Sequence, residues 1–162
     1  MKSIKVGLLG MGTVGGGVYE VLKTNGDEIA RRAGCRIEVV RIAALDVERV
    51  RKIVGDAMPV SNKPMDIVDD PNVDVLVEVM GGTGLAREIV LAAIARGKQV
   101  VTANKALLAV HGNDIFAKAQ EAGVMLAFEA AVAGGIPIVK ALREGLAANQ
   151  VEMLAGIING TT

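Results

Sequence analysis

Short apolar runs rich in β-branched residues alternate with longer segments of mixed polarity through the first 130 residues. The runs occupy residues 4–9, 37–45, 73–80, 99–103 and 124–130. They are continuous rather than alternating, which is typical of strands in a parallel sheet with helices on both faces. We therefore predict a strand at each run.

Helical patterns fill three of the intervals between these runs. They cover residues 15–25, 85–96 and 114–122, and a glycine follows each of them, at Gly26, Gly97 and Gly123. Glycine is common just past the last turn of a helix because it adopts the left-handed conformation easily. The alternation of strand and helix predicts the α/β class, with a doubly wound, mostly parallel, Rossmann-like sheet.

Composition narrows the classes of function. About half of the 162 residues are hydrophobic, and 18 basic residues balance 18 acidic ones. Such a chain can bury the core of one domain, or of one domain plus the start of another. No basic patch predicts nucleic-acid binding, and no apolar stretch reaches the length of a membrane span. Without a signal pattern, we expect a cytoplasmic protein. Cys35 and His111 are single and predict neither a disulfide nor a zinc site.

Five glycines crowd the junction between the first predicted strand and the first predicted helix. Three of them form the pattern G-x-G-x-x-G, which suits a tight turn, a close approach of backbone to pyrophosphate, and close packing of helix on strand. The N–H groups at the helix start add a partial positive charge for the phosphates. We predict a dinucleotide site here, and a glycine-rich turn without a ligand is the alternative. The expected contacts are Gly10, Gly12, Thr13, Val14 and Gly15.

Asp46 follows the second predicted strand, where a carboxylate can accept hydrogen bonds from the adenosine ribose. Arg49 comes soon after and offers a guanidinium to a 2′-phosphate. We expect both residues to contact the cofactor, and the choice between NAD and NADP stays open. The alternative is that Asp46 only caps the following helix.

Polar residues also follow the third and fourth long runs. The segments "VEVMGGTG" and "VVTANKALLA" place Gly82, Thr83, Asn104 and Lys105 at the carboxyl ends of two strands. Ligands of open α/β sheets bind at that edge, so we expect these four residues to contact the cofactor.

Several segments together resemble one known family. "GLLGMGTVGGGV", "EVMGGTG", "VVTANKALLA", "FEAAVAGGIPIVKALREGL" and "GIINGTT" are similar, in that order, to the N-terminal part of homoserine dehydrogenase. The resemblance implies interconversion of L-homoserine and L-aspartate 4-semialdehyde with NAD or NADP, a step toward threonine and methionine. By the same resemblance Lys105 is the catalytic lysine that contacts cofactor and substrate. An isolated lysine could otherwise be a solvated surface group.

The resemblance also implies a sodium ion at the segment "FEAAVAGGIP". Its ligands would be Glu129 and main-chain oxygens of Val132, Gly134 and Ile136. Oxygen ligands of this kind suit a hard cation. The alternative is a tight crossover in which Glu129 caps backbone N–H groups.

The last segment, "NGTT", resembles the start of a substrate domain. Gly160 and Thr161 match residues that contact the substrate in the family. We expect a dinucleotide-binding domain over 1–134 and the beginning of a truncated α+β substrate and dimerisation domain over 135–162. The chain would then be a fragment inactive alone, part of an enzyme that is a homodimer or homotetramer. A stand-alone dinucleotide-binding or sensing module, or another amino-acid dehydrogenase, is the alternative.

Overall fold

The computed structural model describes residues 3–156. One six-stranded sheet lies at its centre, with all neighbouring strands parallel and the order β3-β2-β1-β4-β5-β6. The strands are β1 (Ser3–Leu9), β2 (Arg36–Ala43), β3 (Val60–Ser61), β4 (Val75–Glu78), β5 (Gln99–Thr102) and β6 (Leu126–Ala127). The direction of strand progression reverses between β1 and β4, which confirms the predicted doubly wound sheet.

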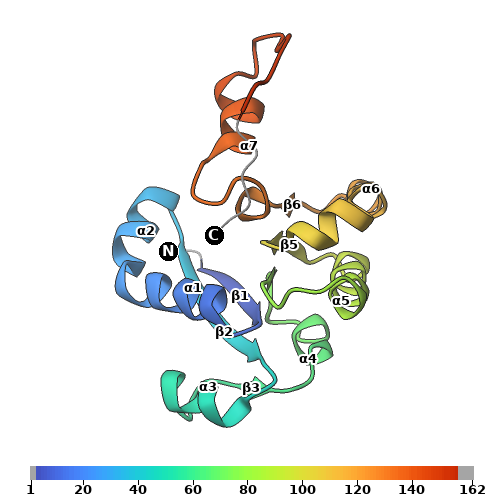
Figure 1. Ribbon diagram of the computed structural model, residues 1–162. Coiled ribbons are helices and arrows are strands. Elements are labelled where there is room, and N and C mark those ends of the chain that lie inside the picture. Colours follow the sequence, from blue (N-terminus) through green and yellow to red (C-terminus); the bar gives the residue numbers. More distant parts are fainter. Residues whose placement is uncertain (1–2, 157–162) are drawn as a thin grey trace.

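Helices cover both faces of this sheet. Figure 1 shows the first two helices on one side of the strands and the fifth and sixth on the other. The helices are α1 (Thr13–Thr24), α2 (Gly26–Ala33), α3 (Val47–Val54), α4 (Met65–Val68), α5 (Gly84–Ala95) and α6 (Lys105–Ala122). Since a covered strand has no polar face, this arrangement explains the continuous apolar runs.

Two adjacent leucines of β1 serve the two halves of the core. Leu8 packs with Met11, Ile42 and Val50 on the side of α1 and α3. Leu9 belongs to the larger cluster on the side of α5 and α6. Successive side chains of a strand point to opposite faces, so the two leucines belong to different layers of the core. A polar residue at either position would be buried without a hydrogen-bond partner, which costs stability.

The helix ends confirm two of the three predicted glycine caps. Gly97 and Gly123 have φ values of 73° and 66°, in the left-handed region. Gly26 was wrongly predicted, because α1 is capped by Asn25 and Gly26 is the first residue of α2. The helix predicted over 114–122 is also longer, since α6 begins at Lys105 with Asn104 as its N-cap.

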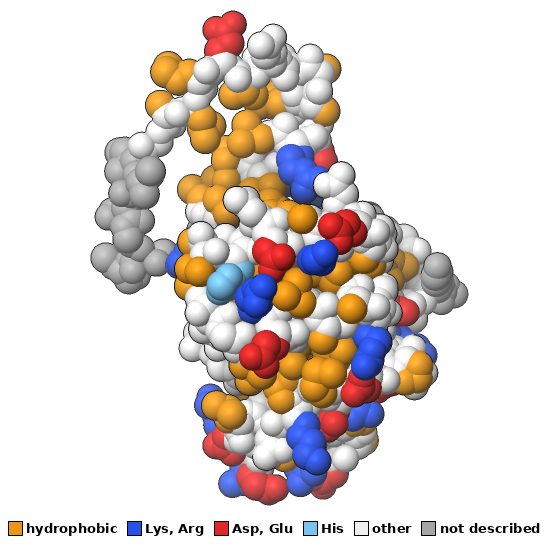
Figure 2. All heavy atoms as spheres, turned by 90° about the vertical axis from the view of Figure 1, so that its right-hand side faces the viewer, with side chains coloured by type: hydrophobic (Ala, Val, Ile, Leu, Met, Phe, Trp, Pro, Cys, Tyr) orange, Lys and Arg blue, Asp and Glu red, His pale blue; other side chains and the backbone are white. Residues whose placement is uncertain are grey.

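The chain leaves the sheet after β6. That strand is only two residues long, shorter than the predicted run, and a 3₁₀ turn, η1 (Glu129–Ala131), follows at once. Next come the short helix α7 (Ile138–Lys140) and the π-helical turn η2 (Ala141–Gly145), which project away from the sheet in Figure 1. Figure 2 shows hydrophobic side chains gathered on the surface of this projecting part. Exposed large hydrophobic residues after η1 include Ile136, Leu146, Val151, Met153 and Leu154.

Within residues 3–156, no helix is both long enough and apolar enough to span a membrane.

Candidate functional site

A cavity of about 410 Å³ opens at the carboxyl ends of β1, β2 and β4. It therefore lies at the reversal of strand order, where α/β sheets bind ligands. Apolar atoms form most of its wall, and a few polar groups stand at its edge. Its lining includes Gly10, Gly12, Leu45, Asp46, Arg49, Asn62, Pro64, Val79, Met80 and Leu85.

The three glycines of the motif have separate structural reasons. Gly10 has φ +102°, and a Cβ there would lie 2.9 Å from the carbonyl oxygen of Val79. At Gly15 a Cβ would lie only 2.1 Å from the carbonyl oxygen of Gly10, so helix and turn could not approach as they do. A Cβ on Gly12, by contrast, would meet nothing within 4 Å. Gly12 lines the cavity and is exposed, which leaves its backbone open to a ligand.

The start of α1 offers backbone donors beside this open glycine. Gly12 is the N-cap of α1, and among the described residues no side-chain cap bond is made at this helix start. Thr13 and Val14, the first two residues of α1, are exposed. An uncapped helix start with its partial positive charge is suited to an anion such as a pyrophosphate.

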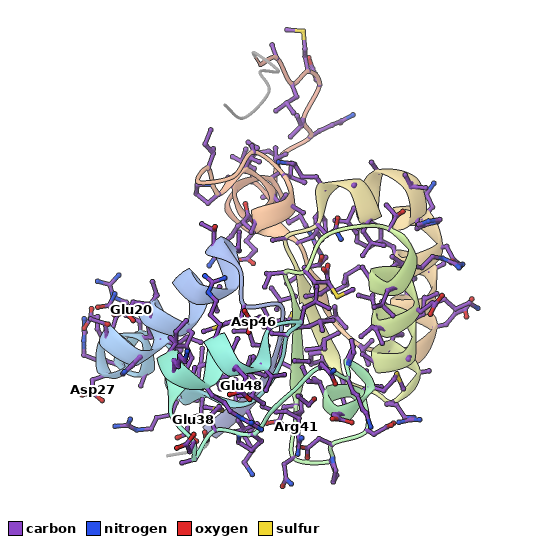
Figure 3. The ribbon with its side chains drawn as sticks, turned by 60° about the horizontal axis from the view of Figure 1, so that its bottom comes forward. Glu20, Asp27, Glu38, Arg41, Asp46 and Glu48 are labelled. Atoms are coloured by element: carbon purple, nitrogen blue, oxygen red, sulfur yellow. The ribbon has the colours of Figure 1, made fainter. Side chains whose placement is uncertain are left out.

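Asp46 both caps a helix and lines the cavity. Its Oδ1 accepts a hydrogen bond from the backbone N of Arg49 at 3.0 Å, so Asp46 makes the cap that was the alternative to a ribose contact. Figure 3 shows Asp46 where β2 passes into α3, with Glu48 further along that helix. Asp46 and Arg49 are both exposed at the cavity. A capping carboxylate keeps further lone pairs, so the cap does not exclude a contact with a ribose.

The residues predicted after β4 and β5 lie beside one another but outside the lining of this cavity. Asn104 is 7% exposed, its Oδ1 accepts a hydrogen bond from the N of Leu107 at 3.0 Å, and its Nδ2 donates to the carbonyl of Gly82 at 2.7 Å. Asn104 thus ties the β4–α5 loop to the start of α6. Thr83 is the N-cap of α5, and Lys105 is exposed as the first residue of α6.

Glu78 is a buried residue at this edge for which no role was predicted from the sequence. It ends β4 and is 0% exposed, and both of its carboxylate oxygens accept hydrogen bonds from the β4–α5 loop, β5 and the start of α6. The available signal was an acidic residue in the apolar run "VDVLVEVM", two positions after Leu76 and therefore on the same face of the strand.

Glu129 makes the backbone contacts that the crossover alternative predicted. Its Oε1 accepts from the N of Val139 at 3.0 Å, and its Oε2 accepts from the N of Lys140 at 2.9 Å. The carbonyl of Ile136 accepts from the N of Ile138 at 2.8 Å. Val132 and Gly134 are exposed in the same segment. A carboxylate and carbonyls with remaining lone pairs have the chemistry that a sodium ion needs.

Gly160 and Thr161, the predicted substrate contacts, lie outside the described residues.

The opposite edge of the sheet carries a different polar cluster. Lys98 is buried, and its Nζ donates to the carbonyls of Asp70 and Val73, both at 2.7 Å. Burial lowers the pKa of Lys98. The pKa of Asp70 is lowered by a hydrogen bond from the N of Asn72 and by the guanidinium of Arg41, whose Nε lies 2.7 Å away. This cluster joins the amino ends of β4 and β5 to Arg41 within β2, so we assign it to stability.

The fold and the cavity define a dinucleotide-binding domain of the Rossmann type. The family model "Homoserine dehydrogenase, NAD binding domain" matches residues 10–129. The chain belongs to this family.

Similar proteins agree with that family. Homoserine dehydrogenase of Pseudomonas aeruginosa is 60% identical over 161 residues, which are 99% of this chain and 37% of that protein. The crystal structure of a homoserine dehydrogenase from Thiobacillus denitrificans has a TM-score of 0.86 at 59% identity and matches 92% of this chain and 34% of that one. The structure of a hyperthermophilic archaeal homoserine dehydrogenase in complex with NADPH has a TM-score of 0.71 at 26% identity and matches 90% of this chain and 50% of that one. The chain thus spans little more than a third of the curated relative's length.

Proposed function

We propose that this chain is the cofactor-binding part of a homoserine dehydrogenase, which interconverts L-homoserine and L-aspartate 4-semialdehyde. The observation that supports this most is the open Gly12 at the uncapped start of α1, on the wall of a cavity at the reversal of strand order. We infer the reaction from the family to which the chain belongs.

Bound at this cavity, a nicotinamide dinucleotide would supply the hydride chemistry: oxidation of homoserine would move a hydride to the cofactor and release the hydroxyl proton, and reduction of the aldehyde would do the reverse. The backbone of Gly12 and the start of α1 bind the pyrophosphate, whereas the N of Gly10 donates to the carbonyl of Ala43 at 2.9 Å and fixes the turn. Asp46 accepts hydrogen bonds from the ribose. Lys105, exposed at the start of α6, holds a positive charge toward the substrate oxygen and stabilises the alkoxide that develops there.

We propose that both NAD and NADP serve as the cofactor. Asp46 repels a 2′-phosphate, whereas Arg49 attracts one, and both side chains are exposed at the cavity. The NADPH complex of the archaeal relative supports the use of the phosphorylated form.

A sodium ion near Glu129 is a second proposal. All of its ligands would be oxygens, from Glu129 and from main-chain carbonyls of Val132, Gly134 and Ile136. Ala133, which lies between two of these ligands in the chain, has a strained φ of 46°. Thermal unfolding in sodium chloride and in choline chloride tests the site. We expect sodium to raise the Tm of the wild type but not of Glu129→Ala, and equal Tm values in the two salts would contradict the proposal.

The domain boundary at residue 134 and the further assembly are also proposals. The chain leaves the sheet just before this point, and the projecting part exposes apolar side chains such as Leu146 and Met153. A cytoplasmic enzyme that associates as a homodimer or homotetramer, with Gly160 and Thr161 at the substrate, fits this picture. Light scattering of the purified protein in the longest form that its gene encodes measures the assembly.

Titration of the purified chain with NADH and NADPH tests the cofactor site. We expect saturable binding of at least one of them, and Gly12→Val should abolish it at unchanged Tm, because the new side chain enters space reserved for the pyrophosphate. Homoserine-dependent reduction of NAD or NADP by the longest form then tests the reaction. Binding without such a reaction would favour a stand-alone sensing module.

A further inference from the structure

Glu78 is fully buried, and its carboxylate accepts hydrogen bonds from several neighbouring segments. Its Oε1 accepts from the N of Met80 at 3.0 Å, from the N of Gly81 at 3.2 Å and, more weakly, from Nδ2 of Asn104 at 3.5 Å. Its Oε2 accepts from Oγ1 of Thr102 at 2.6 Å. Every partner atom donates, and a carboxylate is the side-chain group with enough lone pairs to accept them all.

On one side these bonds fix the loop against which the glycine motif is built. Met80 lines the cavity, and its backbone N and Cα would lie 3.0 Å from a Cβ on Gly10. The N of Val79 also donates to the carbonyl of Leu9 at 2.9 Å. Residues 79–81 thus form a wall behind the first turn of the motif, and Glu78 holds two of their N–H groups.

On the other side the bonds reach the helix that carries Lys105. Thr102 donates to Glu78 and accepts from the backbone N of Asn104 at 3.1 Å. Asn104 is the N-cap of α6, and its side chain also contacts Glu78. The negative charge therefore lies at the start of an 18-residue helix, where the helix dipole favours it.

We propose that Glu78 is a positioning residue for the cofactor site: it fixes the β4–α5 loop behind the glycine turn and the start of α6 beneath Lys105. This inference rests on the proposed function, because it assigns to one buried carboxylate the relative placement of two parts of the same site. Glu78 acts through Met80, Gly81 and Asn104 and is not a catalytic residue.

Two substitutions separate the hydrogen bonds of Glu78 from its volume. Glu78→Leu fills similar space but leaves the part-buried N–H groups of Met80 and Gly81 without the acceptor that holds them in place. Glu78→Gln keeps one oxygen for the loop and can donate its amide to Thr102, which has acceptor capacity. Glu78→Gln should therefore rescue most of what Glu78→Leu loses.

Lys98→Met is the matched control for stability. Lys98 is likewise buried and bonded to backbone, at the start of β5 rather than at the end of β4. We expect Glu78→Leu to raise the Kd of the chain for NADH or NADPH by about tenfold or more. Under conditions where each variant is folded, Glu78→Gln and Lys98→Met should stay within about threefold of wild type. Wild-type affinity in folded Glu78→Leu, or an equal loss in Lys98→Met, would overturn the proposal.

Hydrogen exchange without cofactor tests the positioning role independently of the proposed function. The amides of Met80, Gly81 and Asn104 should exchange faster in Glu78→Leu than in wild type, whereas those of β2 should not. Glu78→Asp, whose carboxylate is one methylene shorter, should speed exchange at Met80 and Gly81 and decides the matter if Glu78→Leu does not fold. Unchanged exchange at these amides refutes the role of Glu78. Failure of the wild type to bind a dinucleotide refutes the proposed function instead, and the exchange result still stands.

Discussion

The α-carbon of Gly15 faces the carbonyl oxygen of Gly10, so that a Cβ on Gly15 would lie 2.1 Å from that oxygen. The first and third glycines of the motif therefore contact each other and bring the turn close to α1. Gly12 takes no part in it and faces the cavity. The fold therefore requires glycine at positions 10 and 15, and we predict that cofactor binding requires it at position 12.

Gly15→Ala should destabilise the chain by about 1–3 kcal/mol, because backbone must move to admit the methyl group. Gly17 is the matched control in the same helix, since a Cβ there meets nothing within 4 Å. Gly17→Ala should be neutral or stabilise by up to about 1 kcal/mol through helix propensity. Urea unfolding measures both, and a Gly15→Ala variant as stable as Gly17→Ala would show that the contact is not as close as described.

Asp46→Ser should shift the cofactor preference toward NADP. Serine keeps a cap for α3, so the change removes the charge with little effect on the helix. The ratio of NADPH affinity to NADH affinity should rise about tenfold, and Arg49→Gln should lower it. The wild type should use both cofactors. A wild-type preference of about a thousandfold, or no change in the ratio in either variant, would contradict this reading of the two residues.

Lys105→Ala, assayed in the longest form that the gene encodes, should lower kcat by about a hundredfold or more. An interaction made mainly in the transition state lowers kcat and kcat/KM together, so KM for the cofactor should change much less. Lys118→Ala, an exposed lysine further along α6, is the control. A kcat within about threefold of wild type would remove Lys105 from catalysis.

Stability should fall in acid through Asp70. The pKa of this carboxyl is lowered from 3.8 in the folded chain, by the N–H of Asn72 first and then by Arg41. Its contribution is therefore complete above the unfolded pKa and is lost as the pH falls through the lower, folded value. Asp70→Asn should cost about 1–3 kcal/mol at pH 6. The variant should also lose less stability than wild type as the pH falls from 4 to 2, because the wild-type carboxyl takes up its proton below its ordinary pKa of 3.8.

Glu48→Gln is the control for this pH dependence, because its ion pair with Arg51 is exposed and contributes little. Urea unfolding at each pH measures the effect. Parallel acid profiles for wild type and Asp70→Asn would show that Asp70 does not govern it.

The sequence by itself determined the class of fold and the place of the turn. Continuous apolar runs can be stable only where both faces of a strand are covered, and G-x-G-x-x-G between a strand and a helix has few other uses. The local pattern did not set the helix boundaries. Nothing in the local sequence distinguishes a glycine that ends a helix from one that begins the next, and Gly26 does the second.

Only the tertiary structure decided the partners of single polar residues. Glu78, Thr102 and Asn104 are far apart in the chain or separated by a turn, and they meet because β4 and β5 are adjacent and parallel. Likewise, the sequence left Glu129 between a cation ligand and a cap, and the fold brings the N–H groups of Val139 and Lys140 to its carboxylate. Periodicity records which side of an element is buried, but a hydrogen bond depends on which elements lie side by side, and that is a property of the folded chain.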